Sequence, residues 1–230
     1  MNAPQEQPAD HAAGQPELRN EPRWTRRKEA RPEEITAAAL ELFVERGYAG
    51  TRLDDVAARA GISKGTLYLY FANKADLFKA VVREGLVSPM GEVRELMDRH
   101  QGPAMDLLRV VVLGWWDRIG STRVSGIPKL VVSEAGNFPE IAEFYLAEVV
   151  HPGTALIRDI LERGIARGEF RPMDCDEAVH LVIAPVLMIA LWKHSLGCFE
   201  PHRTEPRALL QTHLDMLQRG LAPVRAGEPA

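Results

Sequence analysis

The sequence predicts an all-α protein, and three observations carry that prediction. Apolar residues recur at three- and four-residue spacing from residue 32 to residue 219, which is the period of a helix. Alternating runs of β-branched residues, which mark strands, are absent. Glycine, proline and capping residues divide the periodic region into pieces of helical length. We therefore expect a small helical unit at residues 23–80 and a larger one at residues 81–222.

Both ends of the chain are predicted to be disordered. Residues 1–22 contain four prolines and almost nothing apolar, so burial cannot offset the entropy lost on ordering them. Residues 223–230 have a similar composition. The two cysteines exclude a disulfide framework, and no uninterrupted apolar run reaches the about 18 residues of a membrane span. Since no signal peptide is evident, we expect a cytoplasmic protein with no membrane partner.

Charge is distributed unevenly along the chain. The overall net charge of -4 argues against a protein that coats nucleic acid indiscriminately. Residues 19–80, however, carry 12 basic and 9 acidic residues, whereas residues 81–230 carry 16 basic and 20 acidic residues. Contact with phosphates is therefore expected from the N-terminal unit alone.

The N-terminal unit has start and stop signals for three short helices. Pro32 suits a first helical position and Gly47 a stop, which predicts a helix over residues 32–46. Thr51 is expected to cap the second helix, and Gly61 to end it in a left-handed conformation. Ser63 then caps a third helix over residues 64–71. So tight a joint makes the two helices cross steeply, as in a helix-turn-helix.

The residue types in this joint fit a unit that binds DNA. Three apolar residues would lock the helices together, namely Val56, Ile62 and Leu67, and Ala57 permits their close approach. The start of the third helix would be exposed, with a partly positive N-terminus that attracts phosphate. Asn73 begins a fourth helix that continues toward Ser88-Pro89 and leads into the second unit.

The segment from residue 47 to residue 77 resembles a known family. Gly47-Tyr48, Thr51, Asp55-Val56-Ala57 and the unbroken run Ala60–Leu77 are similar to the DNA-binding domain of the TetR family of bacterial regulators. The resemblance implies a homodimer on a palindromic double-stranded DNA operator, with the third helix reading bases.

Carried over position by position, the resemblance implies two sets of DNA contacts. Phosphates are held by Thr51, Arg52, Tyr68, Tyr70 and Lys74. The base edges lie nearest to Lys64, Gly65 and Thr66. Leu69 departs from the family, in which many members have a histidine or an aromatic residue there, and its side chain either touches a thymine methyl or has no role. The alternative for the whole segment is a helical subdomain whose tyrosines are half-buried packing residues.

A basic run, Arg23–Lys28, precedes the first helix. It could extend along the DNA backbone or into a minor groove, as the arms of other DNA-binding proteins do. A solvated charge run with a loosely packed tryptophan is an equal alternative.

The larger unit is expected to contain helices near residues 103–120, 127–135, 139–167, 175–196 and 205–219, with Pro152 and Pro185 kinking two of them. Residues 127–145 are similar to the regulatory domains of TetR relatives that control multidrug efflux. A pocket for a small apolar or amphipathic effector would be lined by Trp115, Trp116, Phe144, Tyr145, Met188 and Trp192. The alternative is that these residues are simply core.

The last two helices carry a broad apolar face. Its members are Val179, Val182, Val186, Ile189, Leu210, Leu214 and Leu217. Pairing of this face with a second copy would form a four-helix bundle with the two-fold symmetry that a palindromic operator requires. Burial inside one subunit remains an alternative for the side that contains Val179.

Together these features predict a repressor that a small apolar ligand releases from DNA. A DNA-binding protein that activates, or one without an effector, is an open alternative. His194, Cys198 and His202 recur every four residues and suggest a metal sensor, but Gly197 and Pro201 interrupt the helix and no fourth ligand is evident. The chain lacks a phosphate loop, a nucleophile elbow and a metalloprotease histidine pair, so we expect no enzyme, no cofactor and no metal.

Overall fold

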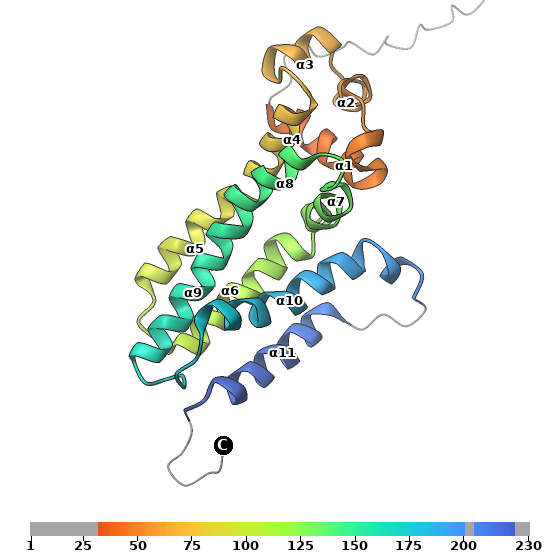
Figure 1. Ribbon diagram of the computed structural model, residues 1–230. Coiled ribbons are helices and arrows are strands. Elements are labelled where there is room, and N and C mark those ends of the chain that lie inside the picture. The colour runs from red at the N-terminus through yellow and green to blue at the C-terminus, as the bar shows by residue number, and fades with distance from the viewer. Residues whose placement is uncertain (1–31, 201–204, 224–230) are drawn as a thin grey trace, which may run out of the picture.

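The computed structural model describes residues 32–200 and 205–223, and all its regular elements in these ranges are helical (Figure 1). The all-α prediction is therefore confirmed. Both predicted tails, apart from Pro223, lie outside the described residues, as does the basic run at residues 23–28.

The helices follow one another along the chain with few long connections. The N-terminal ones are α1 (Pro32–Gly50), α2 (Leu53–Arg59), α3 (Lys64–Tyr70), α4 (Lys74–Val82), η1 (Arg83–Val87) and α5 (Ser88–Arg99). The middle ones are α6 (Ala104–Trp115), η2 (Trp116–Gly120), η3 (Arg123–Gly126), α7 (Ile127–Glu134), α8 (Pro139–Tyr145) and η4 (Leu146–Val150). The last ones are α9 (His151–Ala166), α10 (Cys175–Lys193), η5 (Leu196–Cys198) and α11 (Pro206–Leu221).

The predicted stop and cap signals of the N-terminal helices are found with one exception. Gly47 breaks α1 at φ 77°, and Gly61 leaves α2 at φ 71°, both in the left-handed region that glycine tolerates best. The Ser63 side chain accepts a hydrogen bond from the Thr66 N–H, and Asn73 caps α4 in the same way.

The exception is Thr51, which does not cap α2. The hydroxyl donates backward to the carbonyls of Leu42 at 3.1 Å and Gly47 at 2.7 Å, and the residue is 1% exposed. The residue at the cap position is Arg52, which makes no capping hydrogen bond through its side chain. A threonine hydroxyl can serve either helix, and here it closes the end of α1.

Two long helical segments cross the molecule without an intervening loop. One runs through α4, η1 and α5 to Arg99, so the predicted fourth helix continues past Ser88-Pro89 into the larger unit. The other runs through α8, η4 and α9, and its π-helical turn lies just before Pro152. In a π-turn each hydrogen bond spans one residue more than in an α-helix, which accommodates the missing N–H of a proline. The helix therefore continues past Pro152, where a kink was predicted.

Two hydrophobic cores fill the fold. The first joins the helices α1–α4 to α7 and α8, with Phe43 and Phe78 among its fully buried members. The second lies among α6, α9, α10 and α11. Met90 and Trp115 pack against both cores. Apolar packing thus continues across residue 80, where the sequence suggests a domain boundary.

By length and composition alone, α10 is the one helix in the described ranges that would suit a membrane span. Its inner side, with Val179 and Val182, is buried in the second core against its neighbours, which include α9 and α11. Most of the helix is not buried by the chain itself. Figure 1 shows α10 and α11 together on one flank of the molecule, away from α2 and α3.

Candidate nucleic-acid interface and regulatory domain

The joint between α2 and α3 has the packing of a helix-turn-helix. Val56, Ile62 and Leu67 are at most 1% exposed and lock the two helices, as predicted. Ala57 is buried between them, and its carbonyl accepts from the Ile62 N–H at 2.9 Å. The remaining surface of α3 faces solvent at one end of the molecule (Figure 1).

The exposed side of α3 consists of a central stripe, called the ridge below and formed by Gly65 and Leu69, and of one flanking stripe on each side of it. At about 100° of rotation per residue, Gly65 and Leu69 lie opposite the buried Leu67. Lys64 and Tyr68 form one flank of this ridge, and Thr66 and Tyr70 form the other. Tyr68 and Tyr70 are each 45% exposed, so neither is a packing residue of the core.

Lys64 does not extend freely into solvent. Its Nζ lies 2.8 Å from an Asp54 carboxylate oxygen and 5.9 Å from the centre of the Tyr68 ring. The hydrogen bond to Asp54 raises the pKa of Lys64, so the charge is held at the start of α3. To contact DNA, Lys64 would have to break its ion pair with Asp54 or bind both Asp54 and the DNA at once.

Lys74 and Thr51 hold the domain together in this structure. Lys74 Nζ donates to the carbonyls of Tyr48 at 2.7 Å and Ala49 at 3.3 Å, and it lies 4.4 Å from the centre of the Tyr48 ring. Burial lowers the pKa of Lys74. Thr51 is buried, so its side chain has no surface to offer a phosphate, unlike the exposed Arg52.

Contacts that the sequence did not reveal join this domain to the rest of the chain. Glu134 Oε1, at the end of α7, accepts from the Ala49 N–H at 3.2 Å. The Phe138 and Tyr48 rings lie 4.8 Å apart, edge to face. Phe144 of α8 lies under the cations of Lys79 and Arg83. The last turn of α1 is thus held by Glu134 of α7 and by Phe138, and the junction of α4 with η1 is held by Phe144 of α8.

The six residues predicted to line an effector pocket do not come together. Trp116 is 6% exposed in the second core, whereas Trp115, Phe144 and Tyr145 pack against the edge of the first. Met188 and Trp192 lie on the outer side of α10, at 56% and 40% exposure. Trp115, Phe144 and Tyr145 therefore remain as candidates, and Met188 and Trp192 belong to another surface.

Tyr145 is the polar member of that remaining group. Burial raises the pKa of its hydroxyl well above its usual range, and desolvation is the only cause. No hydrogen bond to a described residue satisfies this hydroxyl. Tyr145 is partly buried at the edge of the first core, and its hydroxyl is a donor that a bound molecule could use.

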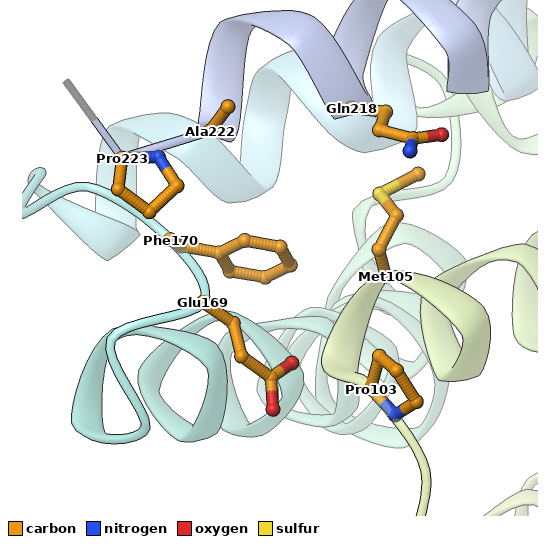
Figure 2. A pocket seen from close by; sticks show the side chains of 7 residues that line it. All are labelled: Pro103, Met105, Glu169, Phe170, Gln218, Ala222 and Pro223. Atoms are coloured by element: carbon orange, nitrogen blue, oxygen red, sulfur yellow. The ribbon is translucent and has the colours of Figure 1, made fainter. Parts of the chain in front are cut away.

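A pocket of about 220 Å³ lies where the start of α6, the segment after α9 and the end of α11 meet. Figure 2 shows its lining residues, which are Pro103, Met105, Glu169, Phe170, Gln218, Ala222 and Pro223. None of the six predicted effector residues is among them. The Glu169 carboxylate accepts from the Ala104 N–H, so it serves as the cap of α6.

Two family models match this chain. The one described as bacterial regulatory proteins of the tetR family matches residues 35–81, which contain the helix-turn-helix. The one described as a tetracyclin repressor-like C-terminal domain matches residues 99–196. The chain belongs to the TetR family. The resemblance inferred from residues 47–77 is therefore confirmed, and the protein is a DNA-binding transcriptional regulator rather than an enzyme.

Relatives and solved structures agree with this assignment. The repressor KstR2 of Mycolicibacterium smegmatis is 27% identical over 64% of this chain and 71% of its own length. The fatty acid metabolism regulator protein of Bacillus subtilis is also 27% identical, over 63% of this chain and 74% of its own. The crystal structure of FadR from Bacillus subtilis in complex with stearoyl-CoA has the same fold, with a TM-score of 0.71 and 21% identity over 83% of this chain and all of its own.

The apolar face assigned to dimerisation needs correction within this TetR fold. Val179, Val182, Leu210 and Leu214 are at most 1% exposed in a single chain, and Val186 is 9% exposed, so they form the subunit core. Ile189 and Leu217 are partly buried against it. The exposed apolar side chains lie on the opposite stripes, namely Leu181, Met188 and Trp192 of α10 and Leu209 and Met216 of α11.

The histidine and cysteine series does not align on a helix. α10 ends at Lys193, and the His194 ring turns to Ser125, whose Oγ lies 2.8 Å from Nε2. Cys198 is exposed in η5, and its Sγ donates to the Lys193 carbonyl. His202 lies outside the described residues, and no group of three potential metal ligands occurs within them.

Proposed function

We propose that this TetR-family regulator is a cytoplasmic homodimeric repressor that binds a palindromic operator and releases it when a long-chain acyl ligand binds. DNA binding is supported above all by the exposed face of α3, which has Tyr68 and Tyr70 on its two flanks and Leu69 on the ridge between them. Major-groove recognition uses such a helix, with base contacts from the centre and phosphate contacts from the sides.

The proposed dimer is supported by the uncovered apolar surface of α10 and α11. Leu181, Ala184, Met188 and Trp192 share one stripe of α10 and are all exposed. Leu209 and Met216 lie on an exposed stripe of the neighbouring α11. A second copy would bury both stripes in a four-helix bundle with two-fold symmetry. It would also cover the outer side of α10, a helix whose length and apolar composition would otherwise suit a membrane span.

The ligand class is supported by the name of one curated relative, by one solved structure of the same fold and by one side chain of this chain. One relative is named for fatty acid metabolism, and FadR was solved with stearoyl-CoA. In this chain Trp115 and Met90 lie where the two cores meet, and the unpartnered Tyr145 hydroxyl is a donor for a carbonyl such as that of a thioester. The apolar residues would take the acyl chain.

Release requires the two copies of α3 to change their separation. Bound to adjacent half-sites, they must lie about 34–36 Å apart, one turn of DNA. Phe144 is the neighbour of Tyr145 on α8. Its ring contacts the cations of Lys79 in α4 and Arg83 in η1. A ligand beside Tyr145 would move α8 and, through Phe144, the continuous helical segment α4–η1–α5, whose first helix directly follows α3 in the chain.

The experiment measures operator affinity by fluorescence anisotropy while stearoyl-CoA is added, with coenzyme A lacking an acyl chain as the control. We expect at least a hundredfold loss of affinity with stearoyl-CoA, which requires the ligand to bind the DNA-free form about 2.7 kcal/mol more tightly. By reciprocity, operator DNA must weaken stearoyl-CoA by the same factor.

Two variants locate the ligand. Tyr145→Phe and Trp115→Ala should blunt the response to stearoyl-CoA and leave operator affinity unchanged, while Val132→Ala, at an exposed position of α7, should leave both unchanged. Binding of stearoyl-CoA that leaves operator affinity untouched would contradict release by this ligand. A promoter fused to the operator distinguishes repression from activation, because a repressor lowers transcription in the absence of ligand.

A further inference from the structure

The outermost point of α3 is an aliphatic side chain with no role inside the chain. Leu69 is 84% exposed, although Leu67, two residues earlier, is fully buried. Folding of the single chain gains almost nothing from Leu69, because a side chain must leave water to contribute hydrophobic stability. Its neighbours Tyr68 and Tyr70 are half-exposed and polar at their tips.

Gly65, one turn before Leu69, is equally unexplained by the packing of the chain. A Cβ built on it would meet only Ser63 Oγ, at the ordinary distance of 3.8 Å. Its backbone is not in the left-handed region, and glycine weakens a helix relative to alanine. The missing side chain leaves a gap on the outer surface of α3 beside Leu69.

The gap and the leucine together form the centre of the surface that meets DNA. Gly65 and Leu69 lie on the ridge, so an α3 seated in the major groove would direct them at its floor and direct Tyr68 and Tyr70 at its phosphate walls. Among the groups that base pairs present on that floor, the thymine C5-methyl is apolar, whereas the others are hydrogen-bond donors and acceptors.

We propose that Leu69 is a specificity-determining residue that packs on the methyl group of one thymine in each half-site, and that Gly65 provides the close approach. The inference rests on the proposed DNA-reading role of α3 and adds the base that α3 selects. Leu69 cannot form a hydrogen bond, so it favours thymine by burial of the methyl and by the cost of leaving a polar base edge against an apolar side chain.

Uracil provides the test, because it differs from thymine only by lacking this methyl. The full-length protein is used to enrich duplexes from a randomised DNA pool, and each thymine of the enriched sequence is then replaced by uracil. At one position per half-site, we expect the replacement to weaken wild-type binding by about fourfold, the effect of one methylene-sized burial.

Leu69→Ala should lose the same factor on the thymine operator and become indifferent to uracil at that position. Val132→Ala removes a similarly exposed side chain from α7 and should behave as wild type. Gly65→Ala should weaken the enriched sequence while leaving thermal unfolding unchanged or raised. Circular dichroism of each variant checks that the fold is kept.

Two outcomes separate this inference from the proposed function. Selective binding in which no thymine methyl is coupled to Leu69 would overturn the inference alone. Failure of the full-length protein to enrich any sequence would overturn both.

Discussion

Ser125 Oγ lies 2.8 Å from His194 Nε2 and joins the segment before α7 to the C-terminal end of α10. The neighbouring Lys193 donates to the carbonyls of Gly120 and Ser121, at 2.8 and 2.7 Å. The same segment also approaches α1, since a Cβ on Gly126 would lie 2.8 Å from Val44 and 3.3 Å from His194 Nδ1. The end of α10 is thus linked to the first helix of the DNA-binding domain through one short segment.

This junction predicts a loss of stability in mild acid. Burial, with smaller effects from Lys193 and Lys129, lowers the pKa of His194 to about 4. The unfolded chain binds this proton near pH 6.5, so between pH 6.5 and 4 the unfolded state holds more protons and the free energy of unfolding falls as pH falls. We expect His194 to account for about 1–2 kcal/mol of that fall, after allowance for solvent screening.

Urea unfolding at several pH values measures the effect. His194→Gln keeps a hydrogen-bonding side chain that does not titrate, so its stability should depend less on pH over this range. Equal slopes in the variant and the wild type would show that other groups cause the loss.

Replacing Gly47 should weaken the connection between α1 and α2. Its φ of 77° is unfavourable for a side chain, and a Cβ there would approach Glu134 Oε1 to 3.3 Å. We expect Gly47→Ala to lower the free energy of unfolding by about 1–2 kcal/mol in urea titrations. Gly50→Ala is the control, because its Cβ would make an ordinary contact 3.6 Å from Arg46 and its φ is not in the left-handed region. An unchanged free energy of unfolding in Gly47→Ala would mean that the backbone at this position can adopt another conformation without cost.

Two substitutions distinguish the subunit core from the proposed dimer surface. Met188→Glu places a charge on the exposed stripe of α10, so it should yield a folded monomer in sedimentation velocity. Leu214→Glu places the charge in the core, so it should unfold the chain. Val132→Glu, at an exposed position of α7, should remain as wild type. A dimeric Met188→Glu would move the interface to another surface.

The proposed phosphate contacts predict a difference in salt dependence. Arg52, at the N-cap of α2, is exposed and carries a charge, whereas Tyr70 of α3 offers a neutral hydroxyl. Arg52→Ala should weaken operator and random DNA alike and reduce the slope of log affinity against log salt by about 1. Tyr70→Phe should weaken both by about 1 kcal/mol without changing the slope.

Anisotropy titrations at several salt concentrations provide these slopes, with Tyr145→Phe as a control remote from α3. Lys74 is a poor choice for the same test, because its loss would also release the carbonyls of Tyr48 and Ala49. Unaltered affinity in the Arg52→Ala, Tyr70→Phe double variant would remove both from the interface.

Local signals predicted the DNA-binding domain well. Gly47, Gly61, Ser63 and Asn73 each have a conformational or capping role that depends on a few neighbouring residues, and each was assigned correctly. Thr51 was assigned wrongly as a cap because its hydroxyl reaches carbonyls of the preceding helix, which the helical period does not reveal.

Faces were harder to predict than helices. Leu209 and Leu210 are adjacent, yet one is 42% exposed and the other is fully buried. In α10 and α11 apolar residues occupy both the inner and the outer stripes, so periodicity alone could not decide which stripe fills the core. For the same reason the sequence could not show that Trp116 is buried whereas Met188 and Trp192 are exposed, because their burial depends on how helices far apart in the sequence pack.

Hydroxyl-radical footprinting of the full-length protein on its enriched DNA tests the central claim most directly. Two copies of α3 in one dimer predict two protected segments of inverted sequence, with centres about 10–10.5 base pairs apart or a multiple of that spacing. Met188→Glu should lose both segments together at concentrations where the wild type protects them. A single protected segment, or two without inverted symmetry, would contradict a dimer that reads a palindrome through α3.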